Sequence, residues 1–134
     1  MQDLLGGQIA AVSGPIGDIT QHLASGRVRI LATSGPKRNR FAPNVPTYTE
    51  QGFAELQHSE WFGFFLPPKA SPELVTRLNA ALRTALAHKD VVEGLATFGL
   101  EAMSSSPAEF SDLLTKDRAK WAPIVKQVGF TADT

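Results

Sequence analysis

The N-terminal part of the chain supplies too few elements to enclose a core, and this shortage constrains the fold more than any other feature of the sequence. Two short apolar runs, residues 9–12 and 28–33, flank a predicted helix over residues 16–24. The order strand, helix, strand predicts a βαβ unit with parallel strands, and continuous apolar runs are typical of parallel strands buried on both faces. Two strands and one helix cannot close a core, so we expect this unit to be incomplete by itself.

The rest of the chain predicts one long strand, a short edge strand and several helices. The aromatic run 61–66 is predicted to be the long strand, and residues 100–103 the short one. Helix starts are indicated by N-cap residues with an acidic residue three positions later, or with proline at the first helical position. These signals lie at Thr47–Glu50, Ser71–Pro72, Asp90–Glu93 and Ser106–Glu109. We expect Gly99 to end the third of these helices, and Pro123 to kink the last helix or end it early.

Composition excludes several classes of function. The 134 residues contain 13 Lys and Arg against 13 Asp and Glu, and no cysteine. The balanced charge argues against nucleic-acid binding, which normally requires a basic excess. Without cysteine there is no disulfide, thiolate nucleophile or cysteine-based metal site. No apolar run is long enough to span a membrane, and the first residues lack the basic start and apolar core of a secretory signal peptide.

Five residues are candidate ligand contacts because they follow the two predicted strands. In open α/β folds, ligands bind beyond the carboxyl ends of the strands, and a helix N-terminus there favours an anion. The candidates are Ser13, Gly14, Asp18, Thr33 and Ser34. Each has a structural alternative. Ser13 could instead be a loop residue or a helix N-cap, and Asp18 could stabilise the helix through its dipole. The hydroxyls of Thr33 and Ser34 could cap the turn before Pro36.

The same residues give little support for an enzyme or a metal centre. Ser13 lacks the flanking glycines of a hydrolase nucleophile, and the three histidines have no metal-ligand spacing. No second acid lies at a spacing typical of a general acid–base pair. Gly6-Gly7 lacks the lysine of a phosphate-binding loop. We therefore expect no catalytic residue, no metal and no cofactor.

Short segments along nearly the whole chain are similar to a known family. These segments, in order, are Asp3–Ile9, His22–Ala32, Lys37–Arg38, Pro43–Thr47 with Glu50 and Gly52, Trp61–Phe64, Pro67–Pro68, Leu78–Asn79, Ala85–Leu86, Gly99–Glu101, Ser106–Phe110 and Lys120–Trp121. In these segments the chain resembles the C-terminal portion of the Bug or TctC family, the extracytoplasmic receptors of tripartite tricarboxylate transporters. One departure is Ala10, where the family often has aspartate. The N-terminal half of the family's first domain, with its main ligand loop, and the glycine-serine loop and Tyr-Lys-Gly segment of its second domain have no counterpart in this sequence.

The resemblance implies part of a two-domain, periplasmic-binding-protein-like (Venus flytrap) α/β fold. Residues 1–57 would belong to the second, ligand-binding domain as the βαβ unit. Residues 58–134 would supply a crossover strand and the C-terminal helices of the first domain. The implied function is the binding of small carboxylates in the periplasm for uptake, with membrane transporter subunits as partners. The alternative is a truncated remnant that does not bind ligand, or that self-associates as a homo-oligomer or by domain swapping.

Overall fold

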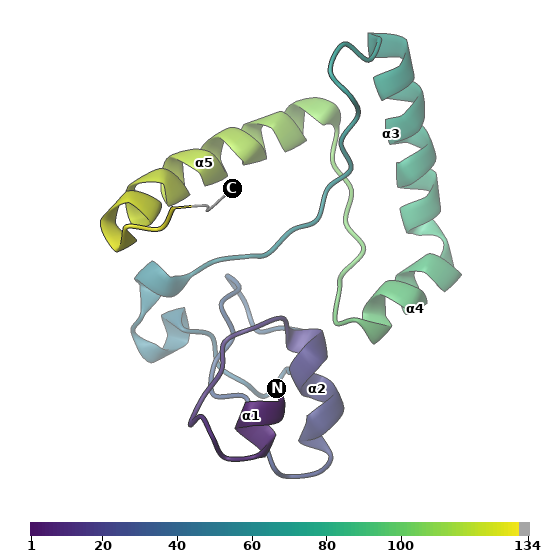
Figure 1. The fold of residues 1–134 in the computed structure, drawn as a ribbon. Coiled ribbons are helices and arrows are strands. Elements are labelled where there is room, and N and C mark those ends of the chain that lie inside the picture. The colour runs from purple at the N-terminus through teal and green to yellow at the C-terminus, as the bar shows by residue number, and fades with distance from the viewer. Residues whose placement is uncertain (132–134) are drawn as a thin grey trace. The chain divides into compact units, whose positions relative to one another are not determined.

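The computed structural model describes residues 1–131, and within this range all regular elements are helical (Figure 1). The elements are α1 (Gln2–Leu5), α2 (Ile16–Leu23), the 3₁₀ helices η1 (Thr49–Gln51) and η2 (Ala54–Leu56), α3 (Pro72–Ala87), α4 (Lys89–Thr97) and α5 (Pro107–Val128). The chain divides into two compact units. The first consists of residues 1–65 and 89–102, and the second of residues 66–88 and the chain from Met103 onward.

The predicted βαβ unit is corrected by the structure, because its helix forms and its strands do not. Helix α2 ends one residue before the predicted end. The predicted strands at residues 9–12, 28–33, 61–66 and 100–103 contain no strand. A strand exists only where its N–H and C=O groups pair with a neighbouring strand. Within residues 1–131 the pairing is limited to one isolated parallel bridge between Thr33 and Thr47.

That bridge organises the residues around it. The N–H of Thr33 donates to the carbonyl oxygen of Pro46 at 3.0 Å, and its own carbonyl accepts from the N–H of Tyr48 at 2.9 Å. Thr47, opposite, is only 2% exposed, and Ala42 in the intervening loop is 6% exposed. No other side chain described by the structure is this deeply buried, so the bridge marks the most enclosed point of the first unit.

The Glu50 carboxylate stabilises the same region through hydrogen bonds from Thr47 and Arg38. The N–H of Thr47 donates to the Glu50 carboxylate at 2.7 Å, and the N–H of Glu50 donates to the Thr47 hydroxyl at 3.1 Å. This confirms the predicted capping box. Arg38 Nε donates to both Glu50 oxygens, at 2.9 and 3.0 Å. The bond from the Thr47 backbone and the neighbouring Arg38 hold the pKa of Glu50 below its ordinary value.

The predicted starts of α3 and α5 are confirmed. The Ser71 hydroxyl accepts from the N–H of Leu74, with proline at the first helical position of α3. The Ser106 hydroxyl accepts from the N–H of Glu109, whose carboxylate accepts from the Ser106 N–H at 2.8 Å. These bonds satisfy donors that the first turn of a helix otherwise leaves unpaired.

Two local expectations are corrected. Helix α4 begins at Lys89, so Asp90 lies inside its first turn and cannot be its N-cap. Helix α5 continues through Pro123 to Val128, so of the two expected alternatives, a kink or an early end, the early end is wrong. Proline removes only one backbone donor, and the helix resumes its ladder beyond it. The expected C-terminal glycine of α4 is confirmed, because Gly99 adopts φ +70° and its N–H bonds to the carbonyl of Ala96.

Much of the apolar surface of the chain is exposed. Phe62, Phe64 and Phe65 are exposed to 70%, 77% and 65%. The described elements therefore leave large aromatic side chains in contact with solvent.

The cap of α5 gives a stability prediction. Replacing Ser106 with alanine removes the acceptor of the Glu109 N–H, and we expect a loss of about 1 kcal/mol in the free energy of unfolding. Helical content followed by circular dichroism during a thermal melt measures the loss. Ser104→Ala, an exposed serine outside the helix, is the matched control. Equal midpoints for the two variants would contradict the assigned role of the cap.

The Glu50 carboxylate gives a pH prediction. Its pKa is lowered in the folded chain from an ordinary 4.5, so its stabilising contribution is complete well above that pH and is lost as the pH falls below it. Acid should therefore lower the stability of the wild-type chain more than that of Glu50→Gln. Denaturant melts at a series of pH values measure the difference. Glu55→Gln, in the neighbouring η2, should keep the wild-type acid dependence; if it does not, the effect does not come from Glu50.

Candidate functional site

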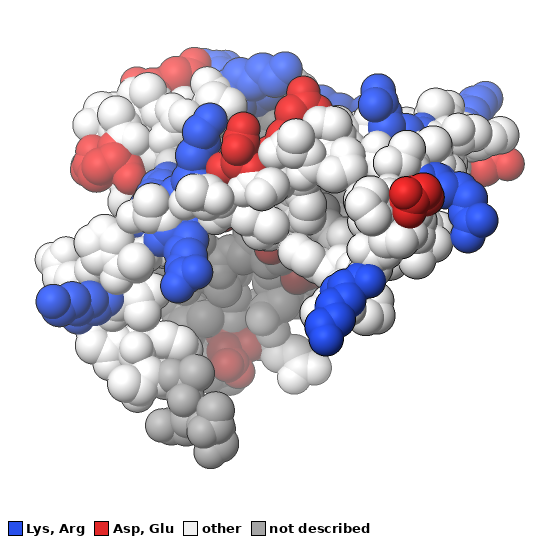
Figure 2. Space-filling model, turned by 90° about the horizontal axis from the view of Figure 1, so that it is seen from above, with Lys and Arg blue, Asp and Glu red and all other residues white. Residues whose placement is uncertain are grey.

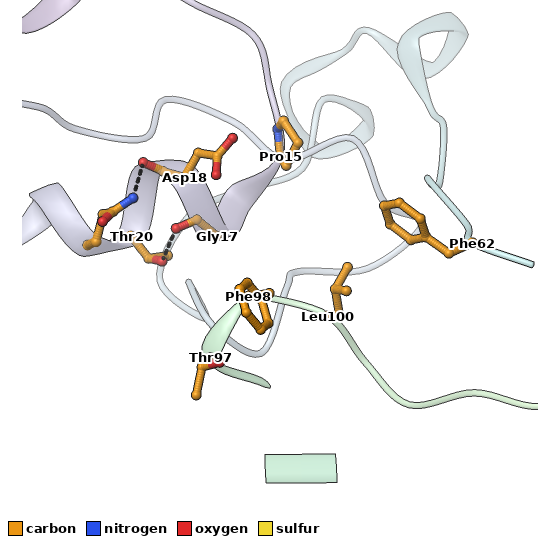
Figure 3. Close-up of a pocket in the computed structure, with 9 residues that line it drawn as sticks. Pro15, Gly17, Asp18, Thr20, Phe62, Thr97, Phe98 and Leu100 are labelled. Carbon is orange, nitrogen blue, oxygen red and sulfur yellow. Dashed lines mark hydrogen bonds between the residues drawn. The ribbon is translucent and has the colours of Figure 1, made fainter. Parts of the chain in front are cut away.

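An open pocket of about 710 Å³ lies in the first unit beside the first turn of α2 (Figure 3). One wall comes from the start of this helix, with Pro15, Gly17 and Asp18. Phe62 comes from the extended segment after η2, Thr97 is the last residue of α4, and Phe98 and Leu100 come from the turn that follows it. The pocket therefore joins segments far apart in the sequence and combines aromatic, aliphatic and acidic surface.

Most polar side chains of the pocket already bond to their own helices. The Thr20 hydroxyl donates to the carbonyl of Gly17 at 3.3 Å, and the Gln21 amide donates to the carbonyl of Asp18 at 3.3 Å (Figure 3). The Thr97 hydroxyl donates to a carbonyl of α4 at 2.7 Å. The Asp18 carboxylate is the one charged group among the lining residues, and no lysine, arginine or histidine lines the pocket.

The five predicted ligand residues are only partly brought together. Asp18 lines the pocket. Ser13 and Gly14 are exposed in the turn that precedes α2 and are not among the lining residues. Thr33 and Ser34 lie at the bridge to Thr47, where their backbone carbonyls accept hydrogen bonds from Tyr48 and His58. The strand edge that was expected to gather all five is missing, because the two strands do not pair with each other.

Thr33 carries the most unusual polar atom near these candidates. Its Oγ1 is buried and has no hydrogen-bond partner in the structure. A buried hydroxyl without a partner is unfavourable by roughly 1–3 kcal/mol, so such a group tends to be satisfied by water or by a ligand. Its role as a ligand contact stays a prediction.

The aromatic wall of the pocket was not predicted from the sequence. Phe62 belongs to the run 61–66, for which the sequence predicts a long strand and no pocket residue. Phe98 lies between the end of α4 and Gly99, and it is 70% exposed. The sequence shows only that a phenylalanine directly precedes the helix-ending Gly99, and this alone does not indicate a pocket.

The described residues form neither a metal-binding cluster nor a membrane-spanning helix, and they carry charges of both signs. Residues 1–131 contain no group of three or more His, Asp or Glu that could hold a metal ion. No helix in this range is long and apolar enough to cross a membrane. Figure 2 shows basic and acidic side chains on the same face of the molecule, in keeping with the formal net charge of zero.

Comparison with known proteins identifies relatives over nearly the whole chain. A family model described as "Tripartite tricarboxylate transporter family receptor" matches residues 1–130. Protein BugT from Bordetella pertussis is 32% identical over 127 residues, which are 95% of this chain and 39% of that protein.

Two further relatives are proteins of the UPF0065 group. One, from the tcbD-tcbE intergenic region of a Pseudomonas species, is 28% identical over 99% of this chain and 40% of its own length. The other, from the gbd 5' region of Cupriavidus necator, is 30% identical over 96% of this chain and 39% of its own length. The chain thus spans about two fifths of the length of each of these three relatives.

The charge of the pocket gives a binding prediction. Removing the like charge with Asp18→Asn should tighten the binding of a dicarboxylate such as succinate by about fivefold, the size of one charge–charge interaction near 4 Å in water. Isothermal titration at low salt measures the affinity. Asp3→Asn, an exposed aspartate outside the pocket lining, is the control. Equal or weaker binding by the Asp18 variant would contradict a repulsive role for this carboxylate.

Proposed function

The chain belongs to the tripartite tricarboxylate transporter receptor family, and we propose that it contributes one wall of a binding site for small carboxylates in such a receptor. The single observation that carries this proposal is the family match over residues 1–130. Family members are solute-binding receptors of a transport system and are periplasmic. We accordingly propose that this chain acts by binding and has no catalytic activity.

The local chemistry around α2 supports an anionic ligand at its N-terminus. The backbone N–H groups of the first turn of a helix carry a partial positive charge, and carboxylates bind well there. Ser13 and Gly14 precede the N-cap residue Pro15 and are exposed, so a ligand can reach their hydroxyl and N–H groups. We propose that these two residues, with Asp18, Thr33 and Ser34, line the ligand site.

The rest of such a site would come from other parts of a receptor. The chain corresponds to 39% of Protein BugT. Capture by a two-domain receptor requires contacts from both sides of a cleft. We propose that residues 1–57 belong to the ligand-binding second domain and residues 58–134 to the first domain. In a full receptor, transporter subunits in the membrane would receive the ligand.

A second hypothesis is favoured by the exposed aromatic segment. Phe62, Phe64 and Phe65 are all exposed to at least 65%. Contiguous apolar surface promotes association, and these exposed rings offer such a surface to a second copy. On this hypothesis the chain is a remnant that self-associates and binds no solute.

Thermal melts with and without ligands separate the two hypotheses. A ligand that binds only the folded state raises the free energy of unfolding, by about 2.7 kcal/mol at a concentration of 100 times its Kd. The midpoint of the melt rises as a consequence. We expect a shift with a member of a panel of di- and tricarboxylates, amino acids and aromatic acids. The amide analogue of each acid, which keeps the skeleton and lacks the charge, is the control ligand.

Matched variants locate the site in the same experiment. Ser13→Ala should reduce the shift, whereas Ser59→Ala, an exposed serine outside the proposed site, should preserve it. Melts that no acid moves, together with a molecular mass by light scattering above that of the monomer, would reject the receptor hypothesis in favour of self-association.

A further inference from the structure

Two glycines, Gly17 and Gly99, bring the first turn of α2 against the end of α4. A Cβ atom built on Gly17 would overlap the carbonyl oxygen of Phe98 and lie 2.5 Å from its carbonyl carbon. A Cβ atom built on Gly99 would lie 2.7 Å from the nitrogen of Gly17 and 2.9 Å from its Cα. Real Cβ atoms essentially never come this close to backbone, so the contact excludes any side chain on either residue. Gly17 and Phe98 lie next to each other in Figure 3.

The backbone at the end of α4 is already fixed by its own hydrogen bonds. The N–H of Gly99 donates to the carbonyl of Ala96 at 3.0 Å, and the N–H of Leu100 donates to the carbonyl of Leu95 at 3.1 Å. This pair of bonds, around a residue at φ +70°, is a Schellman turn. Because these hydrogen bonds fix the turn, the first turn of α2 must fit against it. The carbonyl end of one helix thereby meets the amide end of another, which is the favourable sense of their dipoles.

A second tie between these segments is weaker. Arg40 Nε lies 3.8 Å from the Glu101 carboxylate, and both side chains are nearly half exposed. Exposed ion pairs of this length stabilise little. The glycine contact is therefore the stronger constraint on where the turn lies relative to α2.

We propose that the backbone contact of Gly17 with the Phe98–Gly99 turn is a positioning contact that sets the pocket wall formed by the first turn of α2. It holds Pro15 and Asp18 on one side of the pocket, and Phe98 and Leu100 on the other, at a fixed separation. The contact itself is defined by the structure of the described residues and does not depend on any ligand. Its effect on ligand binding rests on the proposed function.

The sign of one substitution tests the contact. In a helix without such a neighbour, replacing glycine with alanine raises stability, because alanine has the higher helix propensity. Gly94 in α4 has nothing within 4 Å of a built Cβ atom, so Gly94→Ala is the control and should raise the thermal midpoint. Gly17→Ala should lower it, by about 4–8 °C for each roughly fivefold loss in the folding equilibrium constant. A midpoint for Gly17→Ala at or above that of Gly94→Ala would overturn the proposal.

Nuclear magnetic resonance supplies a measurement that a merely local effect would not move. In Gly17→Ala the amide signals of Phe98, Gly99 and Leu100 should shift, although they lie some eighty residues away in the sequence. Gly94→Ala should leave the amide signals of Ile16–Asp18 in place. If Gly17→Ala does not fold, the wild-type chain decides, since it should show a nuclear Overhauser contact between the Gly17 Hα protons and the Gly99 amide proton. The absence of that contact would overturn the proposal.

Titration with succinate and citrate separates this inference from the proposed function. If the wild-type chain binds either acid, Gly17→Ala should weaken binding at least tenfold at a temperature where it is folded, and Gly94→Ala should not. Equal affinities for the two variants would refute the positioning role and leave the receptor hypothesis standing. If the wild-type chain binds neither acid, the function proposed for this chain loses support, while the contact is still judged by the midpoints and the resonance data.

Discussion

Backbone hydrogen bonding governs this structure, because an extended segment becomes a strand only when a neighbour accepts and donates along its length. Residues 57–66 run extended through the aromatic sequence without a ladder. The same requirement explains the exposed surface of Phe62 and Phe64, since a sheet would have one face on which to pack such side chains. The helices, whose bonds are internal, form without any partner.

This contrast explains how much of the fold could be predicted from the sequence. The starts of α3 and α5 were predictable because Ser71 and Ser106 bond to backbone groups three residues away. The strands were not, because an apolar run indicates burial without specifying which segment pairs with it. The start of α4 was misplaced by two residues, because Asp90 was expected to be the N-cap and the helix begins at Lys89; this is within the usual uncertainty of helix ends.

The candidate site was predictable only where it depends on local order. Asp18 was identified from its place in the first turn of α2, and it lines the pocket. The aromatic wall required long-range proximity: Phe98 reaches α2 only because Gly17 and Gly99 leave room for it. Nothing in the residues around either glycine specifies its partner, so this half of the pocket emerges from tertiary structure alone.

The Arg38–Glu50 pair has a consequence for the order of folding. Its partners are only twelve residues apart, and the Thr33–Thr47 bridge closes a loop of similar size. Loops of about ten residues close within roughly 10–100 ns, far faster than distant segments meet. The region from Thr33 to His58 can therefore form early, as a nucleus of low contact order on which slower, long-range pairing builds.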